Sequence, residues 1–178
     1  MQDDPGRFAA SVLPHLDAAY NLARWLVRDA HDAQDVVQDA LVRALRHFDG
    51  FRGGDPRPWL LAIVRNAAFA WLGARRTGEV DFADHEHELA AALALDAPPA
   101  DPESLAIRRA ERREIDAAIA ALPIAFRETL ILRELEDLSY REIAQVLDVP
   151  VGTVMSRLAR ARAMLARALR PEWSGSPK

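Results

Sequence analysis

The chain has 178 residues, no cysteine and a net formal charge of −4. Without cysteine it can form neither a disulfide framework nor a thiolate metal site, and no apolar run approaches the roughly 20 residues that span a bilayer. Half of its residues are hydrophobic and only 7% are aromatic, a composition that favours a folded all-α protein in the cytoplasm without membrane insertion.

The charges are distributed unevenly along the chain. The net charge is +1 over residues 1–77, −6 over residues 78–110 and +1 over residues 111–178. From Val154 to Arg170 there are five arginines and no acid. The overall negative charge therefore does not exclude a nucleic-acid partner, because one face of the C-terminal part is expected to be strongly positive.

Three amphipathic helices are predicted between residues 7 and 76, forming a first domain over residues 1–76. The first helix carries apolar residues at helical spacing, namely Val12, Leu16, Ala19, Tyr20, Ala23 and Leu26. The second is expected to start at Asp32 as its N-cap and to end at Asp49-Gly50. After a polar loop over residues 50–58, the third runs from Trp59 to Arg76. The tryptophans Trp25, Trp59 and Trp71 are expected in the core.

Residues 77–101 are acidic and rich in alanine, and they lack a strong apolar stripe. This composition predicts a flexible linker, which could reach at most roughly 80 Å when extended. Its acids Glu79, Asp81, Asp84, Glu86 and Glu88 either have a binding role of their own or serve only to keep a tether solvated.

A second helical domain is predicted over residues 102–172. Asp101 is expected as an N-cap, with Pro102 at the first helical position. The apolar positions of this segment are Ile107, Ile115, Ile119 and Leu122, and a further helix is expected over residues 124–135.

The segment from Ser139 onward has the pattern of a helix-turn-helix. Ser139-Tyr140-Arg141-Glu142 has the form of a capping box and predicts a short helix that ends near Pro150. Residues 151–153 are the expected turn, and the next helix has Val154, Leu158, Ala161 and Leu165 facing inward. Its outward residues would be Met155, Ser156, Ala159, Arg160 and Arg167. Many helix pairs pack without touching DNA, but the acid-free arginine series favours DNA binding here.

Two sets of motifs resemble the extracytoplasmic-function (ECF) group of RNA polymerase sigma factors, in the sigma-70 superfamily. The C-terminal set, which is similar to the fourth sigma domain, consists of Leu122-Pro123, Phe126-Arg127-Glu128, residues 138–144 and residues 151–162. The N-terminal set, which is similar to the second sigma domain, consists of residues 32–39, residues 48–52, Pro58-Trp59-Leu60 and Arg65-Asn66. The resemblance covers nearly the whole chain except the linker and both ends.

The resemblance implies three groups of binding residues. Polymerase-binding residues on the second helix would be Asp35, Gln38, Asp39, Val42, Arg43 and Arg46, and they would contact the clamp of the largest subunit. Residues for melting and reading the minus-ten element would be Phe51, Arg52, Arg65, Asn66, Arg75 and Arg76, with Phe51 and Asn66 holding a flipped base. Residues for the minus-thirty-five element would be Thr153, Met155, Ser156, Arg157, Ala159, Arg160 and Arg162. For each residue, core packing or a solvated helix face remains the alternative.

The sequence departs from the usual family pattern in three places. Gln34 stands where an acid is frequent, and residues 67–74 are less polar than usual, so Arg75 and Arg76 remain the main phosphate-contact candidates of that helix. Met155 occupies a position often held by Lys or Arg. Our interpretation is that the Met155 side chain makes an apolar contact with a thymine methyl group.

The resemblance implies a non-enzymatic adaptor with no cofactor and no metal. Its partners would be the RNA polymerase core, through the clamp and the flap region, together with promoter DNA and an anti-sigma factor. An enzyme is disfavoured because the chain lacks a phosphate-cradling Gly motif, and His85-Glu86-His87 lacks the spacing of a helical zinc site. The remaining alternative is a dimeric helix-turn-helix regulator that needs no polymerase core.

Overall fold

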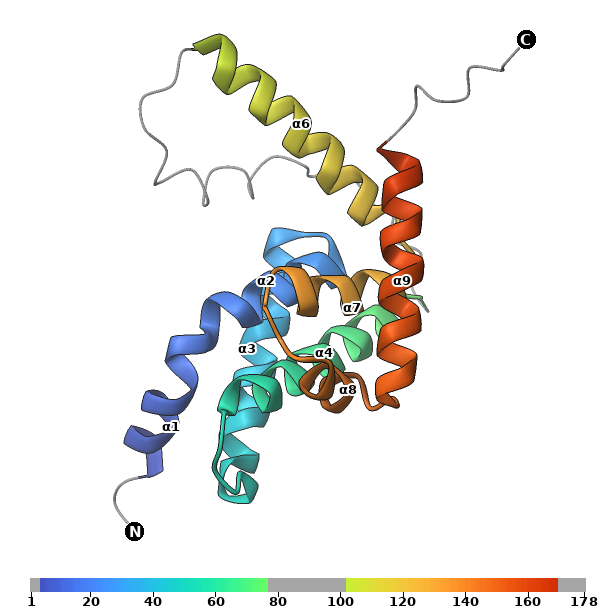
Figure 1. Cartoon of the computed structure of the whole chain (residues 1–178). Helices are drawn as coiled ribbons and strands as arrows, with labels where there is room; N and C mark the ends of the chain where they lie inside the picture. Colours follow the sequence, from blue (N-terminus) through green and yellow to red (C-terminus); the bar gives the residue numbers. More distant parts are fainter. Residues whose placement is uncertain (1–3, 77–101, 170–178) are drawn as a thin grey trace, which may run out of the picture.

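The computed structural model describes residues 4–76 and 102–169, and every regular element in these ranges is a helix. The expectation of an all-α fold is therefore confirmed (Figure 1). No helix within the described ranges is long and apolar enough to cross a membrane. The predicted linker over residues 77–101 lies outside the described residues, as does the Asp101 N-cap.

The N-terminal half contains four α-helices and two 3₁₀ turns in its described part. Their bounds are α1 Asp4–Val12, η1 Leu13–His15, α2 Leu16–Val27, α3 Ala30–His47, η2 Phe48–Gly50 and α4 Pro56–Arg76. The single first helix expected from the sequence is thus divided in two by η1. Pro14 explains the break, because proline lacks the N–H that an α-helix would use and its ring clashes with the preceding turn.

Two helix starts differ from the sequence-based expectation. The N-cap of α3 is Asp29, whose carboxylate accepts a hydrogen bond from the Asp32 N–H at 2.9 Å, so the assignment of Asp32 as N-cap was wrong. Helix α4 begins at Pro56, three residues before Trp59, because the Asp55 carboxylate accepts the Arg57 N–H at 2.9 Å and proline is well suited to a first helical turn.

The N-terminal core lies where α2, α3 and α4 pack pairwise against one another. Its largest fully buried aliphatic side chains are Leu22, Leu26, Val36, Leu60, Leu61 and Val64. Trp25 is buried, and Trp59 and Trp71 are half-buried and pack on the same core. The expected core position is therefore confirmed for Trp25, whereas Trp59 and Trp71 lie at the edge of the core.

The C-terminal half contains α6 Pro102–Ala120, α7 Ile124–Glu134, α8 Tyr140–Leu147 and α9 Val151–Ala168. Helix α6 extends away from the packed helices (Figure 1). Of the apolar positions predicted here, Leu122 is buried and Ile119 is half-buried, whereas Ile107 and Ile115 are exposed.

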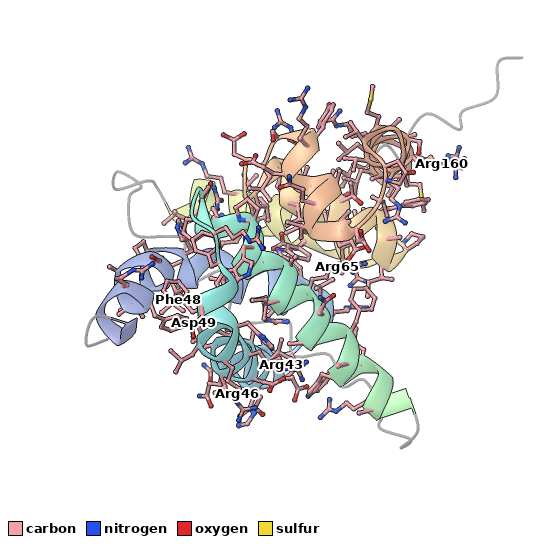
Figure 2. All side chains as sticks on the ribbon, turned by 90° about the horizontal axis from the view of Figure 1, so that it is seen from below. Arg43, Arg46, Phe48, Asp49, Arg65 and Arg160 are labelled. Carbon is pink, nitrogen blue, oxygen red and sulfur yellow. The ribbon has the colours of Figure 1, made fainter. Side chains whose placement is uncertain are left out.

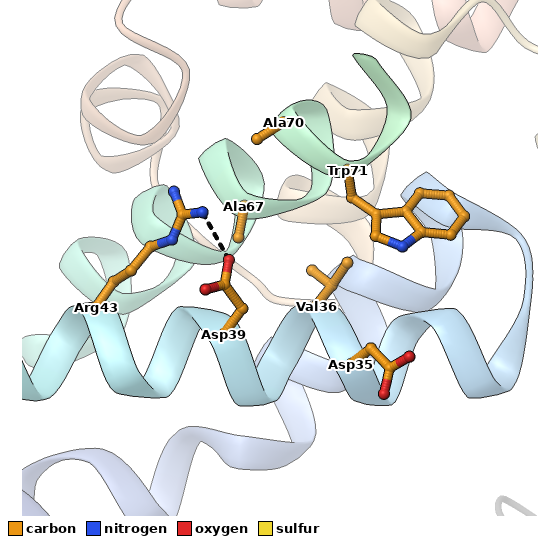
Figure 3. Close-up of a pocket in the computed structure, with 7 residues that line it drawn as sticks. All are labelled: Asp35, Val36, Asp39, Arg43, Ala67, Ala70 and Trp71. Carbon is orange, nitrogen blue, oxygen red and sulfur yellow. Dashed lines mark ion pairs between the residues drawn. The ribbon is translucent and has the colours of Figure 1, made fainter. Parts of the chain in front are cut away.

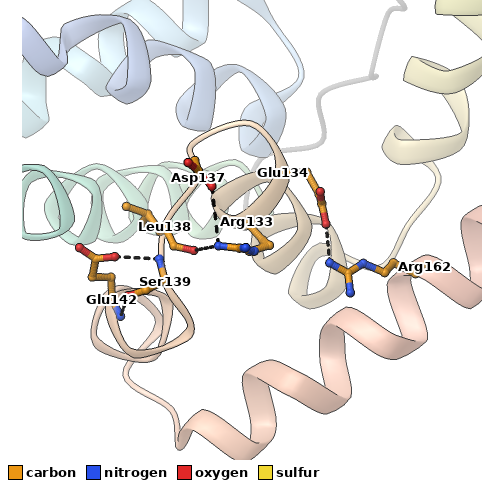
Figure 4. Close-up of polar contacts among 7 residues, drawn as sticks. All are labelled: Arg133, Glu134, Asp137, Leu138, Ser139, Glu142 and Arg162. Carbon is orange, nitrogen blue, oxygen red and sulfur yellow. Dashed lines mark hydrogen bonds and ion pairs between the residues drawn. The ribbon is translucent and has the colours of Figure 1, made fainter.

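The helix-turn-helix has the predicted capping box at its first helix. The Ser139 N–H donates to Glu142 Oε2 at 2.7 Å, and the Glu142 N–H donates to Ser139 Oγ at 3.3 Å (Figure 4). Hydrogen bonding of the Glu142 carboxyl with the Ser139 side chain and with the Ser139 backbone N–H lowers the pKa of Glu142. Ile143, Val146 and Leu147 of α8 are buried, as are Val154, Leu158 and Ala161 of α9.

The turn between α8 and α9 lies three residues earlier than predicted. It consists of residues 148–150, with Asp148 in the left-handed region at φ 52° and Pro150 as the N-cap of α9. Residues 151–153, which were expected to form the turn, are the first turn of α9 instead. A proline disfavours a helical conformation in the residue before it, so the chain leaves α8 before Pro150 and starts again after it.

The two halves of the chain pack against each other. Helix α7 lies against α2, and α8 lies against α4, so the buried side chains of both halves form one continuous core. The sequence did not predict this packing, because its helical periodicity shows that a face is buried but not which helix covers it.

We expect Ser139→Ala to lower the free energy of unfolding by about 1 kcal/mol, because the Glu142 N–H at the start of α8 loses the Ser139 hydroxyl that accepts its hydrogen bond. Urea unfolding at pH 7 measures the change. The matched control is Ser156→Ala, an exposed serine inside α9, for which a change within about 0.5 kcal/mol is expected. Equal effects of both substitutions would contradict this role of the capping box.

Candidate functional site

The outer face of α9 carries exposed residues from the predicted DNA-reading set. Met155, Ser156, Ala159 and Arg160 are all exposed, and 54% of the Met155 surface is accessible. Their spacing of one, three and four residues places them on one side of the helix. Arg160 has no hydrogen bond or ion pair with the other described residues, and it points outward in Figure 2. Thr153 is half-buried, and its carbonyl oxygen accepts a hydrogen bond from Ser156 Oγ at 3.0 Å.

Two arginines of the same helix are engaged by acids of α7. The Arg162 side chain donates to Glu134 Oε1 at 2.6 Å, a hydrogen bond that raises the pKa of Arg162 (Figure 4). Arg157 is half-buried and lies 3.6 Å from Glu128 Oε1. The acid-free sequence of α9 therefore overstates the positive charge of its surface, because carboxylates of α7 pair with two of its arginines.

The loop after α3 is anchored by packed aromatic rings. The Phe51 ring lies 6.0 Å from that of Phe48 and 5.1 Å from that of Trp59, measured between ring centroids. Phe51 remains half-buried, and Arg52 beside it is exposed. Gly53 and Gly54 have φ values of 87° and 91°, a conformation that side chains with a Cβ rarely adopt. The loop thus holds a partly accessible ring in a fixed position.

The predicted minus-ten residues on α4 do not form one open surface. Asn66 is exposed, but Arg65 donates to both oxygens of Glu128 and also lies over the Phe69 ring at 4.6 Å. Arg75 donates to Asp32 Oδ2 at 2.8 Å and lies over the Trp71 ring at 4.1 Å. The side chain of Arg76 lies outside the described part of the chain.

Burial raises the pKa of Asp32, and the Arg75 guanidinium opposes this shift. Arg75 therefore stabilises the ionised form of the Asp32 carboxyl, since a carboxylate that loses hydration requires a nearby cation. This role of Arg75 inside the fold had no signal in the sequence, because the two residues are 43 positions apart.

The predicted polymerase-binding residues share the outer face of α3. All six are exposed, namely Asp35, Gln38, Asp39, Val42, Arg43 and Arg46. Sequence reasoning missed Leu45, which is 52% exposed and lies beside Val42, itself 48% exposed. The two form an apolar patch among charged neighbours, a combination typical of a reversible protein interface.

A hollow of about 420 Å³ lies between α3 and α4 beside this face. Figure 3 shows its lining, which consists of Asp35, Val36, Asp39, Arg43, Ala67, Ala70 and Trp71. Arg43 pairs with Asp39 at 2.7 Å across one turn of α3. Four of the lining residues come from α3 and three from α4, so the hollow continues the predicted polymerase-binding face onto the helix that carries Asn66.

Polar contacts between described residues join the two halves of the chain. Arg65 of α4 donates to Glu128 of α7 at 2.7 and 3.1 Å. Glu136, in the turn after α7, accepts from Asn21 of α2 at 2.6 Å and from Arg57 of α4 at 2.9 Å. Arg127 donates to the Trp25 carbonyl oxygen at 3.2 Å, and burial lowers the pKa of Arg127.

The two acids in these contacts are almost completely removed from solvent. Glu128 is 1% exposed and Glu136 is 4% exposed. The sequence analysis assigned Arg65 to DNA and gave no role to Glu136. The partners in these contacts are separated by at least 63 and up to 115 positions in the sequence, so only the three-dimensional packing brings them together.

One group of described side chains has the donor types for a metal ion. His31, Asp32 and Asp35 each offer a ligand atom, and these atoms lie within 4.8 Å of one another. Asp32 is already paired with Arg75, and the other two side chains are exposed. A cation already occupies the best-buried ligand of the three, so we assign no metal to this group.

Two regions of the chain match known protein families. Residues 12–77 match the family described as Sigma-70 region 2, and residues 112–165 match the family described as Sigma-70, region 4. The two matched regions contain all of the α3, α4 and α9 residues discussed above, apart from the last turn of α9.

The relatives found include RNA polymerase sigma-H factor of Pseudomonas aeruginosa, which is 36% identical over 94% of this chain and 89% of its own length. The ECF RNA polymerase sigma-E factor of Escherichia coli K12 is 39% identical over 79% of this chain and 75% of its own length.

Among solved structures, the sigma factor RpoE in complex with the anti-sigma factor NepR from Bartonella quintana is similar with a TM-score of 0.71. That comparison has 26% sequence identity and covers 93% of this chain and 98% of the other. CnrH in complex with the cytosolic domain of CnrY is similar with a TM-score of 0.63 and 26% identity, covering 93% of this chain and 88% of the other.

We expect Arg160→Ala to weaken the binding of the chain to duplex DNA and to reduce its salt dependence. If Arg160 neutralises one phosphate, the slope of log K against log salt falls by about 0.9. Fluorescence anisotropy over a range of KCl concentrations measures this slope. Arg113→Ala, on the exposed face of α6, is the control that should leave the slope unchanged, and equal losses for both variants would contradict the assignment.

Proposed function

Because the chain belongs to the ECF sigma factors of the sigma-70 superfamily, we propose that it binds the RNA polymerase core and directs transcription initiation from a specific set of promoters. The observation that carries this proposal is that one chain contains both sigma-70 regions, with region 2 before region 4. The relatives reported above include sigma factors of Pseudomonas aeruginosa, Escherichia coli and Bartonella quintana, and they give no support to a dimeric regulator acting without polymerase.

The outer face of α3 is the proposed contact with the polymerase clamp. Its apolar patch of Val42 and Leu45 would be covered by the partner, while the charged residues around it set the orientation. This division is supported by the exposure of both aliphatic side chains, since Val42 is 48% exposed and Leu45 is 52% exposed.

The loop after α3 is the proposed reader of the minus-ten element. A base that leaves the DNA stack loses a few kcal/mol of stacking and pairing, and contact with Phe51 and hydrogen bonds from Asn66 would offset that loss. The half-buried ring of Phe51 and the exposed amide of Asn66 support these roles. Arg52 is exposed next to the ring and is the proposed phosphate contact of the loop.

The outer face of α9 is the proposed reader of the minus-thirty-five element. Arg160 supplies a free guanidinium for a phosphate or a guanine edge, and Met155 supplies an apolar contact for a thymine methyl. Arg157 has a different role in this proposal. It holds α9 against α7 through Glu128, and so it positions the reading face instead of contacting bases.

We further propose that the chain has no catalytic activity of its own, acts in the cytoplasm with the polymerase, and is controlled by an anti-sigma factor. One of the similar solved structures is a complex of a sigma factor with an anti-sigma factor, which supports the last point.

Run-off transcription with purified core polymerase and a promoter library tests the proposed function. Addition of the chain should produce transcripts from a subset of templates that share two short upstream elements, and core polymerase alone should not. Promoter-independent output, or specific binding of a dimer to a palindromic site without polymerase, would contradict the proposal.

We expect the double substitution Val42→Asp/Leu45→Asp to abolish stable binding to core polymerase. The exposed patch would then carry two charges that must lose their hydration on contact, while the fold is unaffected because neither side chain is buried. Co-elution with core polymerase in size-exclusion chromatography measures binding. The control is Leu13→Asp, at another exposed leucine, which should retain binding, and equal loss in both variants would refute the assignment.

A further inference from the structure

Two of the three sulfur-containing residues of this chain lie on α9. The sequence contains no cysteine and three methionines. Met1 lies outside the described residues, whereas Met155 and Met164 both belong to α9. In a chain without thiols, methionine thioethers are the side chains that hydroperoxides oxidise most readily. Oxidation is therefore directed to the helix that is proposed to read the minus-thirty-five element.

Met155 is the more accessible of these two methionines. It is 54% exposed, compared with 38% for Met164. The residues one turn before and one turn after it on the same side of α9 are Val151 and Ala159, whose short side chains cannot extend over a thioether. The Met155 sulfur is therefore open to a small solute, and we expect it to react faster than the Met164 sulfur.

The two methionines occupy different positions on α9. Met155 is the fifth residue of the helix and Met164 is the fourteenth. The nine positions between them correspond to about two and a half turns, so the two side chains leave the helix on opposite sides. A recognition helix contacts base edges with its N-terminal residues. Met155 therefore lies where bases are read, and Met164 lies beyond that region.

A hydroperoxide oxidises a thioether by transferring one oxygen atom to it. The sulfur lone pair attacks one oxygen of hydrogen peroxide, so an S–O bond forms while the O–O bond breaks. The hydroxide that leaves takes the proton from the sulfur-bound oxygen and becomes water. The sulfur loses two electrons, which reduce the peroxide, and methionine becomes methionine sulfoxide. Methionine sulfoxide reductases reverse this change, so the modification is able to act as a switch.

Oxidation changes the polarity of the Met155 side chain without changing its charge. The sulfoxide oxygen accepts hydrogen bonds from water, and a thymine methyl group offers it no donor in exchange. Contact with that methyl group would therefore cost the sulfoxide its hydration. Arg160 keeps its charge, so phosphate contacts of α9 remain. Oxidation thus weakens the reading of bases and leaves the electrostatic attraction to DNA unchanged.

We propose that Met155 is a reversible oxidation site through which a hydroperoxide lowers the affinity of the chain for its minus-thirty-five element. The consequence for DNA rests on the proposed function, whereas the preferential oxidation of Met155 rests only on its exposure. Lys or Arg is frequent at this position in the family, and hydroperoxides do not oxidise those side chains. The sensitivity is therefore specific to a chain that carries methionine here.

Peptide mapping by mass spectrometry tests the site itself. The full chain is treated with hydrogen peroxide for increasing times, and catalase stops the reaction. Trypsin cleaves after Arg157 and Arg162, so Met155 and Met164 fall on separate peptides and the oxygen gained by each can be followed. Met155 should be oxidised faster than Met164. Circular dichroism of the treated chain should be unchanged, because the Met155 side chain is not part of the core.

Two matched variants measure the effect on promoter recognition. Met164→Leu retains Met155, and Met155→Leu retains Met164, while leucine has nearly the volume of methionine and lacks its sulfur. Each variant, with and without peroxide treatment, is assembled with untreated core polymerase. Anisotropy then measures the affinity of this holoenzyme for a fluorescent promoter that the run-off assay has selected. Each variant is compared with its own untreated sample, so an effect of the leucine itself does not enter.

Peroxide treatment should lower the promoter affinity of the Met164→Leu holoenzyme by about fourfold or more, the loss expected when one apolar group of methyl size is no longer buried. A methionine sulfoxide reductase should restore it, and the Met155→Leu holoenzyme should show no loss. Met1 is present in both variants, so its oxidation cannot distinguish them. Co-elution with core polymerase should be unchanged throughout, because none of the predicted polymerase-binding residues is a methionine.

Uracil substitution tests the contact at the level of one methyl group. Each thymine of the minus-thirty-five element is replaced in turn by uracil, which lacks the C5 methyl group of thymine. One such replacement should lower the affinity of the untreated Met164→Leu holoenzyme and should have no further effect after oxidation.

Oxidation of Met164 as fast as that of Met155 would overturn the proposal. Complete oxidation of Met155 without loss of promoter affinity would overturn it too, as would an equal loss in both variants or an undiminished loss on DNA whose element contains only uracil in place of thymine. If the untreated chain directs no promoter-specific transcription with core polymerase, the proposed function fails, and peptide mapping still decides whether Met155 is the reactive site.

Discussion

A continuous apolar core and two carboxylates removed from water join the two halves of this chain. A buried ionised carboxyl is tolerated only where cations or amide donors replace its lost hydration, and Glu128 and Glu136 find these donors on helices that belong to the opposite half. The packing of α7 on α2 and of α8 on α4 brings those donors to the acids. Helix α9 packs on α7 and α8 with Val154, Leu158 and Ala161 buried, and the ion pair between Arg157 and Glu128 adds a polar contact to this packing.

Ion pairing within the chain decides which arginines remain available. Guanidinium groups bind carboxylates and phosphates with the same geometry, and in the structure Arg65 and Arg75 are engaged by Glu128 and Asp32. The arginines that remain unengaged, Arg160 above all, are available for a first encounter. This explains why a chain with a net charge of −4 can bind nucleic acid, since the relevant quantity is which cations lack an internal acid and where they lie.

Local signals in the sequence were sufficient wherever neighbouring residues decide the structure. The capping box at Ser139 and Glu142, the inward residues of α9 and the all-α class were predicted correctly because each depends on hydrogen bonds or spacing within a few residues. Errors arose where two local signals competed. Asp29 and Asp32 are both good N-caps, and the tertiary pairing of Asp32 with Arg75 decides between them. Pro14 and Pro150 likewise moved boundaries that apolar periodicity alone placed elsewhere.

The sequence by itself determined the helical class, the helix-turn-helix and the family to which the chain belongs, because the motifs that carry them are short and contiguous. The resemblance selected six residues of α3 as a binding face, and all six are exposed in the structure. Only the tertiary structure decided which arginines are free. Arg65 and Arg160 look alike in the sequence, and they differ because one lies opposite a buried acid from the other half of the chain and the other does not. Contacts between residues 63 or more positions apart depend on how whole helices pack, and no local pattern records that packing.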